Sequence, residues 1–284
     1  MEAYVMDAFS AQIFGGNQAG VVLPDRELSD TLMQQIAGEF KHSETAFVRV
    51  ESDGSVTLRY FTPAGEVDLC GHATIACFVL LRQLNRIGDG IHTAHTKAAE
   101  LSIEVSGDTV WMEMAPPQIL RTLEGCEVDE LYSAYGLDIS DKPDGMEPKI
   151  VSTGLADIMM PVKDHDTLLR AVQNEPLVTE LSRRYDCTGV HMFCLGDDCT
   201  AYCSNFAPLY DIPEECATGT SNGALTYYLS GYGVVKEGVE NVFIQGEHMH
   251  RPSEIRSRLT VKNGEPSVQI GGRAAMSLSC DLRI

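Results

Sequence analysis

Two cysteines in similar surroundings are the residues of this chain best suited to chemistry. Cys70 follows an aromatic-x-proline turn at Phe61 and opens an apolar helical run, and Cys216 repeats this arrangement after the turn at Phe206. The two cysteines lie 146 positions apart in a chain of 284 residues, close to half its length. The repeat predicts a duplicated fold with one thiol at the same point of each half. A cleft between two such halves would bring two acid/base groups to opposite faces of one small molecule.

The residues around each cysteine predict an anion site at the start of a helix. Gly71 directly before a helix lets the backbone approach a ligand closely, and the N–H groups of a helix N-terminus favour a carboxylate. The same field stabilises a thiolate, so we expect the pKa of both thiols to be lowered toward neutrality. Near Cys216 the hydroxyl groups of Thr218, Thr220 and Ser221 add further donors. The alternative interpretation of each thiol is a buried structural cysteine.

Glu44 and His72 are the other candidate acid/base groups. Glu44 lies in a polar cluster ahead of an apolar strand, where a loop carboxylate could face the cleft. General acid/base catalysis needs such a side chain within hydrogen-bond reach of its proton. The alternative interpretation of Glu44 is a solvated loop carboxylate. His72 is either a hydrogen-bond donor at the helix start or a base, and its spacing favours neither.

The cysteine pattern predicts thiols rather than disulfides. The chain has nine cysteines, an odd number, and its N-terminus lacks the basic and apolar regions of a signal peptide. No Cys-x-x-Cys pair occurs, and the spacing of Cys194, Cys199 and Cys203 is unusual for zinc. We therefore expect no metal at these cysteines. A thiol redox protein and a zinc enzyme are the weaker alternatives.

Composition and charge restrict the class of partner. The chain has 21 Lys and Arg against 41 Asp and Glu, a formal net charge of −20, which disfavours binding to nucleic acid phosphates. The longest apolar run, residues 75–81, is far shorter than the roughly 20 residues that span a bilayer. We therefore expect a soluble, cytoplasmic protein that binds a small molecule and neither nucleic acid nor membrane.

The apolar pattern predicts the elements that position these groups. In the first half we expect strands over residues 4–9, 19–23, 45–50 and 56–61 and a central helix over 72–85. In the second half we expect strands over residues 150–161, 190–195 and 200–206 and a central helix over 220–229. Phe47 and Phe193 are also 146 positions apart, which extends the repeat.

The sequence therefore predicts an α+β fold of two pseudo-symmetric halves, each a mixed sheet wrapped around a central helix, with the active site in the cleft between them. Pro116-Pro117 marks the expected boundary. The halves are residues 1–117 and 118–284, with the last strand free to cross back to the first half.

The motifs together resemble the PhzF-like (phenazine-biosynthesis) family, which has the diaminopimelate epimerase-like fold. The matching stretches are residues 7–9, 16–19, 43–47, 61–63, 66–74, 217–219, 245–247 and 251–253. They run through almost the whole chain, and the string Asp-Leu-Cys-Gly-His-Ala-Thr at residues 68–74 is highly specific. The resemblance implies a cofactor-independent isomerase, epimerase or racemase that moves a proton next to a carbonyl or carboxylate.

The resemblance also implies roles for individual residues. In phenazine-pathway members a glutamate at the position of Glu44 shifts a proton and a double bond in a cyclic hydroxy-amino acid, and His72 with the residues at 215 and 220 completes that site. In epimerase and racemase relatives, cysteines at the positions of Cys70 and Cys216 deprotonate one face of Cα and reprotonate the other. PhzF-like members usually carry proline at position 216, so this chain has the parts of both mechanisms.

The sequence thus predicts an isomerase acting next to the carboxylate of a small amino acid or hydroxy-amino acid, by racemisation, epimerisation or double-bond shift, without PLP or metal. The predicted catalytic residues are Glu44, Cys70, His72 and Cys216. The predicted substrate-binding residues are Asn17, Gly71, Glu215, Ala217, Thr218, Gly219 and Thr220. Family resemblance is compatible with a homodimer. The alternative function is a non-catalytic small-carboxylate-binding protein on the same fold.

Overall fold

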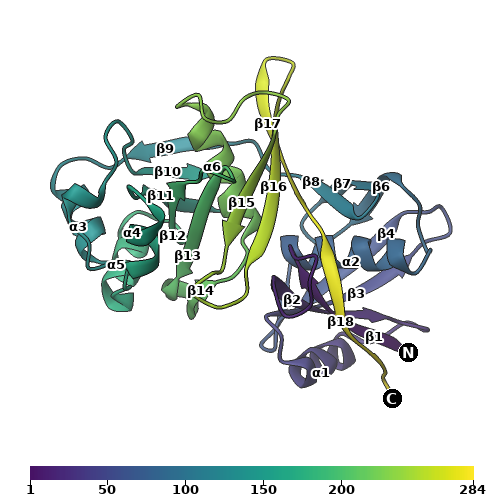
Figure 1. The fold of residues 1–284 in the computed structure, drawn as a ribbon. Helices are drawn as coiled ribbons and strands as arrows, with labels where there is room; N and C mark the ends of the chain where they lie inside the picture. The colour runs from purple at the N-terminus through teal and green to yellow at the C-terminus, as the bar shows by residue number, and fades with distance from the viewer. The chain divides into compact units, whose positions relative to one another are not determined.

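The computed structural model describes residues 1–284, which form two compact units. Unit 1 comprises Met1–Glu113 and Gly271–Ile284, and unit 2 comprises Met114–Ile270. The first segment of unit 1 thus ends at Glu113, close to Pro116-Pro117. The C-terminal segment belongs to unit 1 because its strand pairs antiparallel with the first strand of the chain, as the yellow and purple arrows show in Figure 1.

Unit 1 contains a mixed sheet and two helices. The strands are β1 (Glu2–Ala8), β2 (Asn17–Leu23), β3 (Glu44–Val50), β4 (Val56–Phe61), β5 (Glu66–Val67), β6 (Gly90–His95), β7 (Glu100–Ser106), β8 (Thr109–Glu113) and β18 (Ala274–Asp281), and the helices are α1 (Asp30–Phe40) and α2 (Gly71–Gln83). The sheet order is β18-β1-β2-β3-β4-β6-β7-β8, and of these pairs only β2–β3 and β4–β6 are parallel. The short β5 pairs with β4.

Helix α2 forms the centre of unit 1. Every residue from His72 to Leu81 is buried, as expected for a helix that is apolar on nearly all sides. The helix packs on β1, β2, β3 and β8. Its one buried hydroxyl is satisfied, because Thr74 Oγ1 lies 2.6 Å from the Tyr60 hydroxyl and donates to the Cys70 carbonyl at 2.7 Å.

No helix of the chain has both the length and the apolar character needed to cross a membrane.

Unit 2 repeats this architecture with more helices. Its strands are β9 (Gln118–Thr122), β10 (Lys149–Ser152), β11 (Ala156–Pro161), β12 (Gly189–Leu195), β13 (Ala201–Ala207), β14 (Ile212–Glu215), β15 (Glu240–Gln245), β16 (Ser253–Lys262) and β17 (Glu265–Gly272), which runs into the unit boundary. Its helices are α3 (Cys126–Ser133), α4 (His165–Arg170), α5 (Glu175–Arg184) and α6 (Gly219–Ser230), with short 3₁₀ turns η1 (Ile139–Asp141) and η2 (Pro208–Tyr210).

The strand order of unit 2 matches that of unit 1. It runs β9-β10-β11-β12-β13-β15-β16, with parallel pairs at β11–β12 and β13–β15. Figure 1 shows α3, α4 and α5 on one side of this sheet and α6 on the other. The structure confirms the predicted α+β class, with a mixed sheet around a central helix in each unit.

The equal spacing of Phe47 and Phe193 does not reflect structural equivalence. Phe47 packs edge-on against Phe61 on the α1 face, whereas Phe193 packs against Tyr228 of α6. The counterpart of Phe47 is Met192, because the Val22–Phe47 pair occupies the same ladder position as the Met160–Met192 pair. The segment between the aromatic-x-proline turn and the cysteine is one residue longer in the second half. A one-residue difference in spacing places a strand side chain on the opposite face.

Candidate functional site

The first candidate group consists of three donor side chains of unit 1. Cys70 Sγ lies 3.4 Å from His72 Nδ1 and 3.9 Å from His72 Nε2. His72 Nε2 lies 3.3 Å from Glu44 Oε2 and 3.5 Å from Ser43 Oγ. The structure thus brings together three of the four predicted catalytic residues, Glu44, Cys70 and His72. We call them the unit 1 cluster.

The positions of these side chains follow from two element starts. Glu44 is the first residue of β3 rather than a loop residue, and Cys70 is the N-cap of α2, with His72 in the first turn. Cys70 has extended backbone, and its carbonyl accepts the N–H of Thr74 at 3.0 Å, so the chain turns directly into the helix. The positive end of the helix dipole therefore lies at the thiol.

Burial makes the unit 1 cluster a sheltered site. Cys70 and His72 are each 7% exposed, and the Glu44 side chain is 20% exposed. Glu44 Oε2 itself is buried and makes no hydrogen bond, although it lies within ion-pair distance of the His72 ring. A carboxylate oxygen in this state is available to a proton or a cation. Glu44 is therefore not the solvated loop carboxylate of the alternative interpretation.

Asn17 and Gly71 are the other predicted site residues of unit 1. Asn17 is buried at the start of β2, opposite Ala8. The preceding Gly16 has a φ of +61°, and a Cβ there would lie 2.2 Å from the Ala8 carbonyl oxygen, so this turn requires glycine. Gly71 is the first residue of α2, and a Cβ there would lie 3.4 Å from Met112 Cε.

In unit 2 the thiol of Cys216 lies in a different setting. The N-cap of α6 is Thr218, so Cys216 precedes the helix by two further residues and is not at its N-terminus. The expected lowering of its pKa does not occur. Burial, followed by the charge of Glu215, raises the pKa of the Cys216 thiol to about 11, while Arg251 opposes this effect. At neutral pH Cys216 is therefore a protonated thiol.

Gln245 anchors the loop that carries Cys216. Its Nε2 donates to the Glu215 carbonyl at 2.7 Å, and its Oε1 accepts from the Thr218 N–H at 3.2 Å and from Asn222 Nδ2 at 2.8 Å. The Thr218 hydroxyl in turn donates to the Glu215 carboxylate. These contacts fix the start of α6 through a strand that lies far away in the sequence.

The turn after β15 holds the other side of this loop. Ser253 Oγ donates to the Cys216 carbonyl at 2.6 Å, and a Cβ at Gly246 would lie 2.7 Å from the Cys216 carbonyl oxygen. Gln245, Gly246, Arg251 and Ser253 therefore support Cys216, a role that the sequence did not assign. In the sequence, these residues stand out only because residues 245–247 and 251–253 match the family, and that match did not indicate their function.

The remaining predicted residues of unit 2 lie around the same helix start. Ala217 is buried, and Gly219 begins α6. The carbonyl of Thr220 accepts a hydrogen bond from Thr153 Oγ1 at 2.8 Å. Because Gln245 already occupies the N–H of Thr218, the first-turn amides without an intrahelical acceptor that remain for an anion are those of Gly219, Thr220 and Ser221.

A buried polar network lies beneath the start of α6. Ser221 Oγ donates to Asp157 and accepts from Asn205 Nδ2 at 3.1 Å, and the same amide lies 3.2 Å from His191 Nδ1. Burial lowers the pKa of His191 to about 3 and raises that of Asp157. His191 is therefore neutral, and we assign the network to positioning α6.

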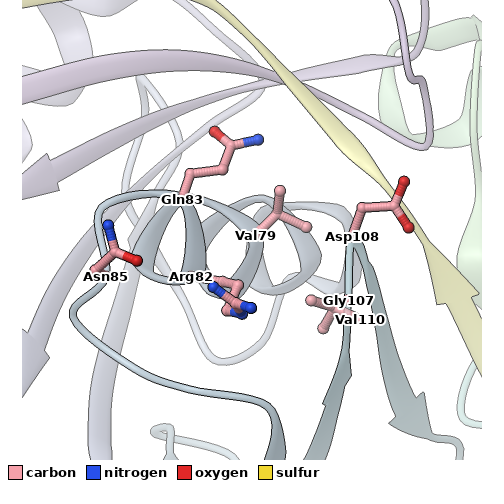
Figure 2. A pocket seen from close by; sticks show the side chains of 7 residues that line it. All are labelled: Val79, Arg82, Gln83, Asn85, Gly107, Asp108 and Val110. Carbon is pink, nitrogen blue, oxygen red and sulfur yellow. The ribbon is translucent and has the colours of Figure 1, made fainter.

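One hollow of the structure lies away from all of these residues. It has a volume of about 240 Å³ and is lined by Val79, Arg82, Gln83, Asn85, Gly107, Asp108 and Val110. Figure 2 shows these residues on the C-terminal end of α2, just beyond it at Asn85, and on the β7–β8 hairpin. Arg82 is already paired with Asp89 at 2.6 Å. The unit 1 cluster lies at the other end of α2.

The duplicated α+β fold, with a cysteine before each central helix, defines a class of protein. Residues 6–280 match the PhzC-PhzF family, described as phenazine biosynthesis-like protein, and the chain belongs to this family. It is 30% identical to the uncharacterized isomerase YddE of Escherichia coli over 97% of this chain and 96% of that protein.

Solved structures show the same fold. A PhzF-family phenazine biosynthesis protein from Bacillus anthracis superposes with a TM-score of 0.90 at 26% identity, covering 100% of this chain and 99% of that one. A probable proline racemase from Agrobacterium radiobacter superposes with a TM-score of 0.62 at 12% identity, covering 100% and 93%. The second likeness shows a shared fold.

Proposed function

We propose that this protein is an isomerase that moves a proton next to the carboxylate of a small amino acid or hydroxy-amino acid. The observation that carries the proposal is the unit 1 cluster, in which a thiol, an imidazole and a carboxylate meet at a helix N-terminus. Such groups transfer protons when they lie within hydrogen-bond reach, and the helix start favours a carboxylate. The name isomerase of the curated relatives supports the same reaction class.

In the first version of the reaction the two thiols act on opposite faces of Cα. The Cys70 thiolate, beside His72, removes the α-proton, and the C–H electron pair moves into the carboxylate to form an enediolate. Cys216 then delivers the proton of its S–H group, which is present at neutral pH because its pKa is raised to about 11. The amides of Gly71, Gly219 and Thr220 stabilise the developing negative charge.

In the second version Glu44 removes and returns the proton on one face, and His72 assists in a double-bond shift. The observation that favours this version is the buried Oε2 of Glu44, which makes no hydrogen bond and lies 3.3 Å from His72 Nε2. A carboxylate oxygen in this state can accept a substrate proton without first giving up another partner.

Exchange of the substrate Cα–H with solvent deuterium, followed by NMR over a panel of amino acids and hydroxy-amino acids, tests both versions. The first version predicts that Cys70→Ala and Cys216→Ala each abolish exchange with inversion. It also requires that one substrate molecule protects both thiols from iodoacetamide. The second version predicts that Glu44→Gln is inactive while Cys216→Ala survives. Cys280→Ala removes an exposed thiol and is the matched control. If the wild-type protein exchanges no substrate of the panel, the proposal is wrong.

A further inference from the structure

We propose that Glu44, Cys70 and His72 also form a binding site for one Zn²⁺ ion. The three side chains each offer one ligand atom, and these atoms all lie within 4.8 Å of one another. Thiolate, imidazole and carboxylate are the three protein ligand types that zinc prefers. The site was not visible in the cysteine spacing, because two of the three ligands are not cysteines and Glu44 comes from a distant strand.

The separation between the imidazole and carboxylate donors fits a tetrahedral ion. Zinc binds sulfur at about 2.3 Å and nitrogen or oxygen at about 2.0–2.2 Å, so tetrahedral angles separate N from O by about 3.3 Å and S from N by about 3.5 Å. The observed separations are 3.3 Å between His72 Nε2 and Glu44 Oε2 and 3.9 Å between Cys70 Sγ and His72 Nε2. The thiol lies nearer Nδ1, at 3.4 Å, so the Cys70 side chain must turn toward Nε2 to join Glu44 on one ion.

Burial and rigidity prepare the site for a cation. Glu44 Oε2 is buried without a hydrogen bond and has only the His72 ring at 3.3 Å, so a cation would supply a second, charged partner. Cys70 and His72 lie at the N-cap and in the first turn of a helix that is buried along its length, which limits their movement. Ligands held on such elements lose little entropy when an ion binds.

The donor set selects the kind of ion. A thiolate and an imidazole suit zinc, whereas magnesium and calcium take oxygen ligands. Three protein ligands leave the fourth tetrahedral position open to water or to a substrate carboxylate. Cys70 would bind the ion as its thiolate.

Zinc in this site would inhibit the isomerase. The ion occupies the donor atoms of Cys70, His72 and Glu44 that the reaction needs for proton transfer. This consequence rests on the proposed function, whereas the binding itself rests on the donor geometry alone. The two parts are therefore measured separately.

Titration of the full-length, chelator-treated protein with Zn²⁺ by calorimetry, and with Co²⁺ by absorption spectroscopy, tests the binding. We expect one equivalent of zinc and a thiolate-to-cobalt charge-transfer band. Cys70→Ser removes the band, and Glu44→Gln and His72→Gln weaken zinc binding more than about tenfold, since even an outer-shell partner of a ligand contributes about 10- to 100-fold. Circular dichroism checks that each variant is folded.

Cys126→Ser and Cys280→Ser are the matched controls, because both thiols are exposed and lie outside the cluster. They leave the affinity and the band unchanged. The inference is overturned if the folded wild-type protein does not bind zinc, or if binding is the same in Cys70→Ser. If zinc binds at the cluster without suppressing deuterium exchange, the site stands and the proposed catalytic role of these residues fails.

Discussion

The two units share a strand order, yet the starts of their central helices differ. At the start of α2 the thiol is the N-cap residue and contacts a histidine that lies beside a carboxylate. At the start of α6 the thiol lies two residues before the N-cap, in a loop fixed by the amide of Gln245. One duplicated scaffold thus carries an ionisable cluster in unit 1 and a protonated thiol in unit 2. The two thiols therefore lie in different electrostatic surroundings.

The contrast is sharpest at Glu44, because its counterpart in unit 2 is Gly189. The Ala19–Glu44 pair that begins the β2–β3 ladder corresponds to the Asp157–Gly189 pair of the β11–β12 ladder. A Cβ at Gly189 would lie 1.9 Å from the Phe206 carbonyl oxygen. Unit 2 therefore has no room for a carboxylate at this position, and the acidic group of the cluster belongs to unit 1 alone.

Substitution at this pair of positions gives the largest expected effect on stability. Gly189→Ala forces a methyl group against the backbone of β13, and we expect it to lower the free energy of unfolding by about 3 kcal/mol. Glu44→Ala should change it by less than about 1 kcal/mol, because that side chain is partly exposed. Urea unfolding measures both. Equal free energies of unfolding for the two variants would contradict the correspondence between Glu44 and Gly189.

Gln245→Ala tests the anchoring of the Cys216 loop. The substitution removes the hydrogen bonds of Gln245 to the Thr218 N–H and the Glu215 carbonyl and one of the two bonds of Asn222 Nδ2, at a cost of about 1–3 kcal/mol. We also expect loss of Cys216-dependent deuterium exchange. Gln34→Ala in unit 1 is the matched control and should cost less, because its bonds to the Thr62 and Pro63 carbonyls lie near the surface. Urea unfolding measures the stability of the two variants. A Gln245→Ala variant that is as stable and active as the wild-type protein would refute the anchoring role of Gln245.

Arg251→Gln tests the charge beside Cys216. Arg251 lowers the pKa of this thiol against the larger effects of burial and Glu215, so its removal raises the pKa further above about 11. The thiolate fraction at a given alkaline pH then falls. We expect alkylation of Cys216 by iodoacetamide to slow roughly twofold to tenfold, since a tenfold change corresponds to one pKa unit. Mass spectrometry of the Cys216 peptide measures the rate. Arg258→Gln, on β16 and beside Glu240, should leave it unchanged.

How much of the structure the sequence can predict depends on which contacts are local in the chain. The central helices and most strands could be predicted, because their apolar periodicity lies within each segment. The Cys70–His72 contact could also be anticipated, since only Gly71 separates the two residues at one helix start. The support of Cys216 by Gln245 and Ser253 could not, because it depends on the parallel pairing of β13 with β15. The raised pKa of Cys216 also depends on burial by distant residues.

Two histidine–glutamate pairs give the smallest expected difference between the units. In unit 2, His248 lies 3.3 Å from Glu214 and 3.0 Å from the Leu169 carbonyl, both of which favour the imidazolium. In unit 1, His95 lies 3.5 Å from Glu100, and both side chains are exposed to solvent. Only the first pair is sheltered enough to affect stability, because solvent and salt screen an exposed pair.

The hydrogen bond to Glu214 raises the pKa of His248 in the folded protein, although partial burial opposes it. A raised folded-state pKa contributes stability that is complete below the ordinary histidine pKa of about 6.5 and is lost as the pH rises through the folded value. We expect His248→Gln to abolish this decline, which amounts to less than about 1 kcal/mol after screening. His95→Gln should leave the pH profile of urea unfolding unchanged. An equal effect of both substitutions on the pH profile would show that the His248–Glu214 pair is no better sheltered than the His95–Glu100 pair of unit 1.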